Sequence, residues 1–409
     1  MSFQQGLSGL NAASKQLEVI GNNVSNANTV GFKQSRAEFS DVFANSLNGG
    51  GASQIGIGTK VSSVAQQYTQ GNITATNNSL DIAINGGGFF RMSNNGAITY
   101  SRNGQFQMDK FGYIVDAESK RLTGYSASST GVLSGGAPTE LNIDTGDLQP
   151  SATATVVGLV NLDSRNTSLP AAGFDPADPT TYHNSTAVTV FDSLGNSHTL
   201  QSFFVKTAAG AWSVFTAADG VSTTVLPTPT ATLAFTGTGI APTVTPSNAA
   251  PVSFAVTTGA TSPVPMTLDY SGSTQFGSNF SVNSLSQDGF TSGRLAGFNT
   301  GSDGTIVGRY TNGQSRILGQ VVLANFVNPN GLQSLGGNAW AESATSGASL
   351  VGTPNTGSLG VLQSSAVEDS NVDLTAELVN MITAQRVYQA NAQTIKTQDQ
   401  VLQTLVNLR

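Results

Sequence analysis

The sequence predicts an α+β, multidomain protein with a nested layout, in which paired N- and C-terminal helices form a coiled-coil-like inner domain and flank two mainly antiparallel β domains. Three observations lead to this prediction. Apolar residues recur at heptad spacing at both ends of the chain. Between the ends the period falls to two residues, with Asn-Gly turn signals that are typical of hairpins. The segment 146–284 differs in composition, because it holds 11 of the 14 Pro residues and both His residues.

The first 31 residues are predicted to form an amphipathic helix. Their apolar residues follow steps of four and three at Phe3, Leu7, Leu10, Leu17 and Val24. We expect Gly31 to be the C′ residue of this helix, since helices often end at a glycine in the left-handed conformation. Four Asn residues precede it, at Asn22, Asn23, Asn26 and Asn28. Their amides are predicted to cap the helix end and, in addition, to contact neighbouring molecules.

The C-terminal residues predict a second, longer helix, from about Asn371 to Leu408. Ser370 with Asp373 three residues later resembles a capping box at its start. The heptad series includes Leu374, Leu378, Met381, Tyr388, Ala392, Ile395, Leu402 and Val406. Together with the apolar residues of the first helix, these residues form what we call the predicted polymerisation seam.

When the two helices pack together, each buries one apolar stripe of the other. Further apolar residues on the second helix therefore need another partner. These residues are Ile382, Val401, Leu405 and Leu408. Val361–Arg409 also holds seven Gln, where an ordinary solvated helix would carry Glu and Lys. Amides can pair with copies of themselves, whereas repeated like charges cannot, which favours a homopolymer. A solvated helix that is rich in Gln explains the composition equally well.

The alternating segments predict the following division. Residues 1–31 and 360–409 form an inner helical polymerisation domain, and 32–71 form a connector, with Asn48–Gly58 as a flexible linker. Residues 72–145 and 285–359 form a middle β domain, and 146–284 form an outer β domain. Trp212 and Trp340 are predicted core residues of these two β domains. Turns are expected at Asn95-Gly96, Asn103-Gly104, Phe111-Gly112, Asp192–Ser197, Asn312-Gly313 and Asn330-Gly331.

The composition excludes several classes of function. Only 10% of the residues are charged, the net charge is −7 and no basic stripe occurs, which argues against nucleic acid as a partner. There is no Cys and no apolar run of about 18 residues, so we expect no disulfide, no thiolate chemistry and no membrane insertion. His183 and His198 are interpreted as two surface residues, and carboxylates are too sparse for an acid/base pair. We therefore expect no enzyme activity, catalytic residue, metal or cofactor.

Several motifs resemble those of the bacterial flagellar axial proteins, the rod and hook subunits. Asn22–Lys33 resembles their N-terminal signature, and the family motif falls on Asn22, Asn23, Asn26, Asn28, Gly31 and Phe32. Ser370–Leu408 resembles their C-terminal signature, while Asp81–Phe90 and Tyr100–Asp116 resemble shared β segments. Two stretches resemble the hook subunit in particular: Val190–Lys206 resembles the start of its inserted outer domain, and Gln287–Trp340 resembles the segment that returns from that domain. Residues 217–265 carry no motif.

The resemblance implies a structural subunit that polymerises into a short curved tube and acts as a universal joint between rod and filament. It implies as partners the protein itself, the flagellar rod, the hook–filament junction protein, the hook cap protein and the flagellar type III export apparatus. It also implies a location in the flagellum, outside the cell, after export without a cleaved signal peptide. The alternatives are a distal rod subunit, which would be much shorter, a surface β-sandwich adhesin, and a surface glycan hydrolase.

Overall fold

The computed structural model describes residues 2–42, 56–246 and 249–407, which form two compact units. Unit 1 comprises Met1–Thr145, Gly297–Arg309 and Ser315–Arg409, and unit 2 comprises Gly146–Ala296 and Tyr310–Gln314. We predicted that the chain returns to the middle β domain at residue 285, whereas it returns to unit 1 at Gly297. The strand that contains residue 285 pairs within unit 2. The further split of unit 1 into inner, connecting and middle parts stays a prediction.

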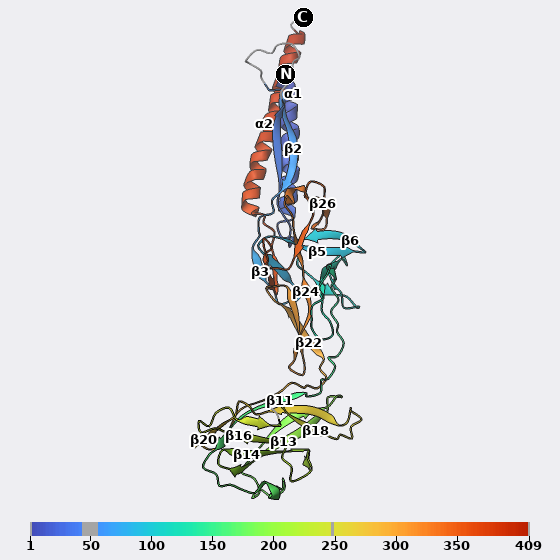
Figure 1. The fold of residues 1–409 in the computed structure, drawn as a ribbon. Helices are drawn as coiled ribbons and strands as arrows, with labels where there is room; N and C mark the ends of the chain where they lie inside the picture. Colours follow the sequence, from blue (N-terminus) through green and yellow to red (C-terminus); the bar gives the residue numbers. More distant parts are fainter. Residues whose placement is uncertain (1, 43–55, 247–248, 408–409) are drawn as a thin grey trace. The chain divides into compact units, whose positions relative to one another are not determined.

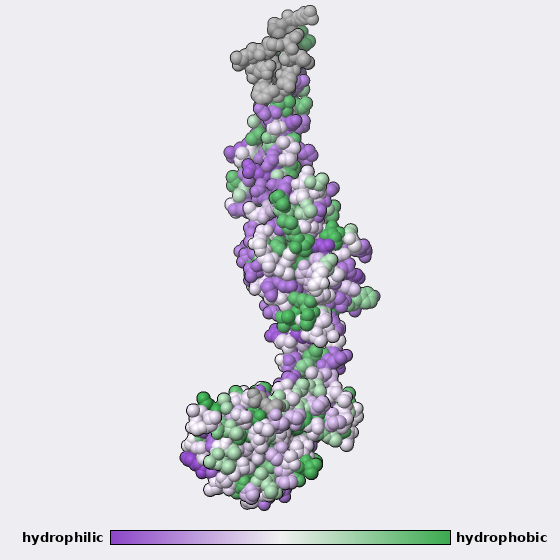
Figure 2. Space-filling view, in the orientation of Figure 1, coloured by the Kyte–Doolittle hydropathy of each residue, from purple (hydrophilic) through white to green (hydrophobic). Residues whose placement is uncertain are grey.

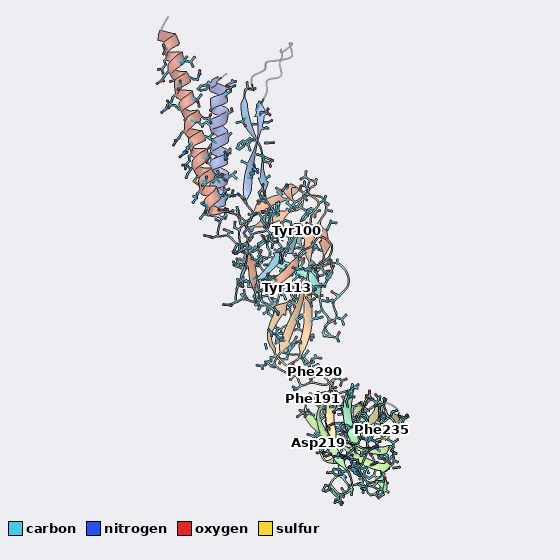
Figure 3. All side chains as sticks on the ribbon, turned by 90° about the vertical axis from the view of Figure 1, so that its left-hand side faces the viewer. Tyr100, Tyr113, Phe191, Asp219, Phe235 and Phe290 are labelled. Carbon is cyan, nitrogen blue, oxygen red and sulfur yellow. The ribbon has the colours of Figure 1, made fainter. Side chains whose placement is uncertain are left out.

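Two helices and a hairpin form one end of unit 1. Helix α1 (Ser2–Ser25) packs on α2 (Leu374–Asn407), and the antiparallel strands β1 (Ser35–Val42) and β2 (Gly58–Gln66) also pack on α1. Figure 3 shows α1 between α2 and this hairpin. The predicted flexible linker at 48–58 lies mostly outside the described residues. The predicted connector on either side of it contains the antiparallel pair β1–β2, whose register shifts once, between Glu38 and Phe39.

The C-terminal end of α1 and the N-terminal end of α2 both differ from the prediction. The helix α1 ends at Ser25, and turns occupy Asn26–Gly31, so Gly31 is not its C′ residue although its φ is +72°. Asp373, rather than Ser370, caps α2, because its Oδ1 accepts hydrogen bonds from the backbone N–H groups of Thr375 (2.9 Å) and Ala376 (3.1 Å). The end of α1 is a local consequence of the amide-rich stretch, whose side chains bond to the backbone in place of a further helical turn.

The remainder of unit 1 is a β structure around a 13-stranded sheet (Figure 1). Its main path runs β22–β23–β24–β9–β5–β6–β27–β26. These strands span Leu295–Thr300, Thr305–Tyr310, Ser315–Val321, Arg121–Ser126, Phe89–Asn94, Ala97–Ser101, Ala339–Ala341 and Gln333–Gly336. The strands off this path are β7 (Gln107–Met108), β8 (Ile114–Val115), β10 (Thr139–Glu140), β25 (Leu323–Asn325) and β28 (Leu350–Gly352).

Two small antiparallel pairs connect the N-terminal and C-terminal parts of this β structure. They are β3 (Ile73–Ala75) with β30 (Ala366–Glu368) and β4 (Ile82–Asn85) with β29 (Val361–Ser364). A core of edge-to-face rings lies nearby, and its buried aromatic members are Phe89, Tyr100, Phe326 and Trp340. Trp340 is 2% exposed, so its predicted place in a β core is confirmed.

Unit 2 contains two sheets whose buried faces share one hydrophobic core. The first contains β18 (Ala249–Phe254), β19 (Val264–Asp269), β11 (Thr155–Asp163), β20 (Thr274–Phe276) and β21 (Ser281–Gln287). The second contains β12 (Asn184–Phe191), β13 (Ser197–Ala208), β14 (Ala211–Ala218), β15 (Val221–Ser222), β16 (Ala231–Ala234) and β17 (Thr243–Thr245). Trp212 is fully buried in this core, as predicted. The strand β11 pairs in parallel with β19 and β20, so the pairing is mainly but not wholly antiparallel.

The second sheet of unit 2 is buried on both faces. Phe204 points into the core between the sheets, while Phe203 and Phe215 pack against Phe174 on the opposite face. Phe174 follows the short 3₁₀ helix η1 (Ala171–Gly173) in the segment that covers this face. This arrangement explains why β13 and β14 have nearly continuous apolar sequences rather than a strict alternation.

Four of the six predicted turns are hairpin turns in the structure. Asn95-Gly96 joins β5 to β6 with positive φ at both residues, as type I′ turns require. Phe111-Gly112, Asp192–Ser197 and Asn312-Gly313 join β7–β8, β12–β13 and β23–β24. Asn103-Gly104 is not a hairpin turn; a Cβ on Gly104 would lie 1.7 Å from the Ile82 carbonyl oxygen, so glycine permits a close approach there. Gly331 ends a 3₁₀ turn, η2 (Pro329–Gly331), between strands that do not pair with each other.

The surface of unit 2 is poor in strongly polar groups. Figure 2 shows that the unit with β11 to β20 is mostly pale, which reflects its many Ser, Thr, Gly and Ala residues. No helix in the described part of the chain is long and apolar enough to cross a membrane.

Candidate functional site

The two terminal helices meet through small side chains. A Cβ on Gly9 would lie 2.8 Å from Asn391 Oδ1, and one on Gly6 would lie 3.1 Å from Ile395 Cγ1. Ala13 and Ala384 are both 2% exposed in the same interface. The helices therefore make their closest contact at Gly6, Gly9 and Ala13. Gly6 and Gly9 each precede a residue of the predicted heptad series, Leu7 and Leu10, by one position.

A leucine at Gly9 is expected to force the helices apart. We expect Gly9→Leu to destabilise the helix pair by about 1–3 kcal/mol, as overpacking of an interface does. Amide hydrogen exchange of Asn391 and Ile395 measures this effect. Gly21→Leu is the matched control, because nothing lies within 4 Å of its Cβ position, and equal exchange in the two variants would contradict the packing described here.

The close approach leaves many residues of the predicted polymerisation seam uncovered. The exposed ones are Phe3, Leu7, Leu374, Leu378, Tyr388, Leu402 and Val406. Leu10, Leu17, Val24, Met381, Ala392 and Ile395 are half-buried. Within one chain the predicted seam is therefore only partly the α1–α2 interface, and its outer residues are available to another molecule. Ile382 and Val401, which we expected to lack a partner, are also exposed.

The family motif forms the exit from α1. Asn23 is 1% exposed, and its amide donates to the Ser35 carbonyl (2.8 Å) and accepts from the Ser35 N–H (2.9 Å). An amide side chain carries both the donor and the acceptor that this pair of hydrogen bonds to the backbone needs. Asn23 therefore fixes the first residue of β1 against the end of α1. Asn26 bonds to the backbone and side-chain oxygens of Asn22, whereas Asn28 is exposed.

The last two motif residues lead into the β structure. The Gly31 N–H donates to the Glu368 carbonyl (2.8 Å), and a Cβ at this position would lie 2.5 Å from the Asn103 nitrogen. Gly31 is thus required by close approach as well as by its positive φ. Phe32 is half-buried, and its N–H donates to the Thr29 carbonyl (3.2 Å).

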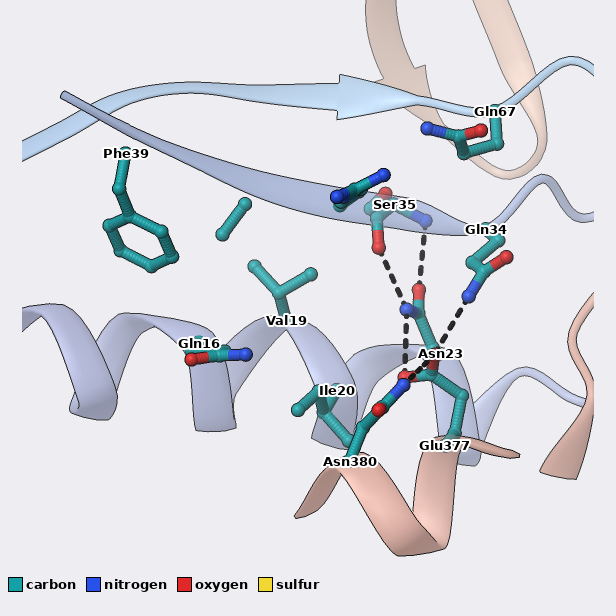
Figure 4. Close-up of a pocket in the computed structure, with 12 residues that line it drawn as sticks. Gln16, Val19, Ile20, Asn23, Gln34, Ser35, Phe39, Gln67, Glu377 and Asn380 are labelled. Atoms are coloured by element: carbon teal, nitrogen blue, oxygen red, sulfur yellow. Dashed lines mark hydrogen bonds between the residues drawn. The ribbon is translucent and has the colours of Figure 1, made fainter. Parts of the chain in front are cut away.

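The same exit contacts the start of α2. Glu377 is 3% exposed and accepts from Asn23 Nδ2 (3.3 Å), Gln34 Nε2 (2.7 Å) and Asn380 Nδ2 (3.4 Å). Figure 4 shows the bonds of Asn23 with Ser35 and Glu377 and that of Gln34 with Glu377. Asn371 accepts from the Gln34 N–H (2.8 Å), so amides join both terminal segments at this point.

A buried charge cluster lies next to this amide network. Glu368 Oε1 is 2.7 Å from Lys33 Nζ, and Glu368 Oε2 is 3.0 Å from Arg102 Nη1. The side chains of Lys33 and Glu368 are fully buried, and that of Arg102 is 5% exposed. The cluster unites the N-terminal motif, the end of β6 and β30, so it forms only when three distant parts of unit 1 come together.

Burial and charge oppose each other in this cluster. Burial lowers the pKa of Lys33, although the Glu368 carboxylate acts in the opposite direction. Burial likewise lowers the pKa of Arg102. Lys33 also donates to the Thr69 carbonyl (2.7 Å), and the Gly71 N–H donates to Glu368 (2.8 Å). Glu368 is therefore the group that compensates both cations. The sequence analysis did not identify it.

His198 in unit 2 corrects the prediction of two surface histidines. It is 8% exposed, because its ring packs on Phe254 and lies 2.7 Å from Asp219 Oδ2 and 3.4 Å from Asp192 Oδ2. Figure 3 marks Asp219. Burial alone would lower the pKa of His198, but the hydrogen bonds to the two carboxylates outweigh it and raise that pKa. His183 bonds elsewhere, to the Thr167 carbonyl. No group of three His, Asp or Glu among the described residues could hold a metal ion.

This arrangement predicts a pH-dependent stability of unit 2. Because the folded-state pKa of His198 is raised, its contribution is complete below pH ~6.5 and is lost as the pH rises through the folded-state pKa. We expect the difference in unfolding free energy between wild type and His198→Gln to shrink between pH 6 and pH 9. Urea denaturation across this range tests it. Asp219→Asn, which removes the nearer carboxylate, is expected to reduce the dependence, and an unchanged pH dependence in both variants would contradict the assignment.

The amide network of Asn23, Gln34, Ser35, Asn371 and Glu377, together with the Lys33–Glu368–Arg102 cluster, forms what we call the junction. Four family models match the chain. They are described as "Flagella basal body rod protein" (residues 3–33), "Flagellar hook protein FlgE/F/G D1 domain" (83–160), "Flagellar basal body protein FlaE D2 domain" (161–290) and "Flagellar basal body rod FlgEFG protein C-terminal" (363–408). These matches define the class of protein as a flagellar axial protein.

Relatives over the full length specify the family. The flagellar hook protein FlgE of Escherichia coli K12 is 42% identical over 415 residues, and that of Salmonella typhimurium LT2 is 42% identical over 416 residues, with 100% of each chain covered in both cases. The chain belongs to the flagellar hook protein family. A crystal structure of Helicobacter pylori FlgE2 has the same fold, with a TM-score of 0.54 and 14% identity, over 72% of this chain and 100% of that one.

Proposed function

We propose that this chain is the structural subunit of the bacterial flagellar hook, and that many copies form a short curved tube that transmits torque from rod to filament as a universal joint. The observation that carries the proposal is the row of exposed apolar residues on α2. Leu374, Leu378 and Ile382 are 46%, 45% and 51% exposed. Each forfeits part of the ~1.5–3 kcal/mol that burial would contribute, and sister molecules can supply that burial.

The interfaces between copies must be heterologous, since only head-to-tail contacts build an open helical tube. We infer that the close-packed helices make the stiff part of this tube. The surface of unit 2, which is poor in charge, favours wet contacts that exchange easily as each subunit passes from the inside to the outside of the bend. The three-part division into inner, middle and outer domains belongs to this proposal.

The proposal includes the partners that such a subunit needs. These are the rod, the hook–filament junction protein, the hook cap protein and the flagellar type III export apparatus. It places the polymer in the flagellum, outside the cell, after export without a cleaved signal peptide. We propose no enzymatic activity.

The second candidate is a distal rod subunit of the same family. The presence of unit 2 between the two β segments of unit 1 favours the hook. Electron microscopy of purified protein that is induced to polymerise separates the two. Curved tubes are the expected result, straight tubes would support the rod, and the absence of any tube would contradict both and favour an adhesin.

A further inference from the structure

The face of α2 that packs on α1 continues past the described residues of α1. Gly6 lies against Ile395, and Asn23 bonds to Glu377, so the two helices are antiparallel. Position 399 and those after it therefore have no described α1 residue opposite them, and Figures 1 and 3 show α2 extending beyond α1. We call residues 399–407 the overhang.

The overhang repeats the spacing of the covered face. Ile395 is followed on the same stripe by Leu402 and Val406, at steps of seven and four residues. Ile395 is half-buried by α1, whereas Leu402 and Val406 are 54% and 74% exposed. The same side of one helix is thus covered along most of its length and uncovered at its end.

A groove lies toward the opposite end of the helix pair. It has a volume of about 500 Å³ and runs between α1, β1 and the first turns of α2 (Figure 4). This volume is within the range of ~300–1,000 Å³ that binding pockets have. Its apolar lining includes Val19, Ala37 and Phe39, and Gln16 and Asn380 supply amides. Phe39 is 39% exposed, so the apolar lining is accessible to another molecule.

We propose that the groove of one copy receives the overhang of a second copy of this chain, an inference that rests on the proposed self-assembly. The two surfaces have matching chemistry. Leu402 and Val406 can pack on Val19 and Phe39, and the amides of the overhang can pair with those of the groove. Arg36 borders the groove without an ion pair to any described residue, and Asp399 supplies a carboxylate on the overhang.

The geometry requires that the occupant comes from another copy. At 1.5 Å per residue, the groove at Gln16 and the overhang at Leu402 are roughly 25 Å apart along the helix pair of one chain. The overhang of one copy reaches the groove of the next if the two copies are displaced by the same distance, roughly 25 Å, along the helix direction, which is the rise of about 17 helical residues. Such a contact joins two different surfaces and is therefore heterologous, as an open tube requires.

Cysteine crosslinking tests this contact directly, because the natural chain contains no Cys. Full-length Phe39→Cys and Leu402→Cys variants are mixed in equal amounts, polymerised and treated with a mild oxidant. Because each groove Cys meets an overhang Cys in about half of the contacts of an equal mixture, we expect up to about half of the protein in tubes to form covalent dimers, and the double variant to form longer covalent chains. Each single variant alone is expected to stay monomeric on a denaturing gel, since a disulfide needs Cα atoms within about 7 Å. Gln16→Cys with Val401→Cys provides a second, independent pair.

The possible outcomes separate this inference from the proposed function. Curved tubes in which neither pair forms mixed dimers would overturn the groove–overhang contact and leave the proposed function intact. Dimers from Leu402→Cys alone would also overturn it, because they indicate a symmetric contact. Failure of the wild-type protein to form any tube would overturn the proposed function and this inference with it.

Discussion

Replacement of Glu368 by Gln is expected to destabilise unit 1 by about 3–5 kcal/mol, the usual cost of removing one partner from a buried ion pair. The carboxylate compensates two buried cations, Lys33 and Arg102, at 2.7 and 3.0 Å. Without it, both cations would have to stay charged in a desolvated site or lose a proton. Lys33 can lose its proton more readily than Arg102, whose guanidinium stays charged in proteins.

The matched control for this prediction is Lys33→Met. It leaves the Arg102–Glu368 pair, whose charges balance, so we expect it to cost less than half as much as Glu368→Gln. Each unit contains one Trp, and Trp212→Phe leaves Trp340 as the fluorescent reporter of unit 1. Urea denaturation in this background measures both variants. Equal stability of Glu368→Gln and its parent would contradict the role assigned to the cluster.

The second large effect is expected from Leu378→Asp, which should abolish tube formation while both units remain folded. Leu378 is 45% exposed in the single chain, so the substitution hardly changes the monomer. In the proposed polymer the side chain is buried, so Asp there forfeits part of the ~1.5–3 kcal/mol of apolar burial and also buries a charge. Together these penalties raise the critical concentration by at least ~10-fold. Leu402→Asp is expected to act in the same way through the overhang.

Sedimentation of polymerised protein over a concentration series measures this effect. Thr394→Asp is the control, because it places the same charge on an exposed position of α2 without removing an apolar side chain. We expect it to raise the critical concentration less than Leu378→Asp does. A Leu378→Asp variant that polymerises like wild type would exclude this part of the predicted seam from the interface.

Periodicity was sufficient to predict the class of fold. Heptad spacing predicted both helices, because this signal comes from local geometry. Four of the six predicted turns are hairpin turns, but only two of the four Asn-Gly predictions are among them. The covered face of α2 was harder to predict. Large apolar residues dominate the sequence pattern, but the structure packs Gly6, Gly9 and Ala13 against α2, since small residues permit the closest approach. Much of the apolar stripe then faces outward.

The polar residues of the junction could be predicted only in part. The Asn-rich stretch drew attention to Asn23, but its partners Ser35 and Glu377 are 12 and 354 residues away. The Lys33–Glu368 pair spans 335 residues, so no local pattern could predict it. The one available signal was rarity, since a charged residue is uncommon in a chain with only 10% charge. The burial of His198 also depends on a distant partner, because Asp219 lies 21 residues away, just after the end of β14.

Truncation tests the central claim, that the two terminal segments are incomplete alone and are completed by sister molecules. Residues 1–30 and 380–409 are removed, and the protein is examined by circular dichroism and by electron microscopy under polymerising conditions. We expect the remaining β structure to keep its strand signal, and we expect no tubes at any concentration at which the full chain polymerises. Tubes built by the trimmed protein would contradict the central claim.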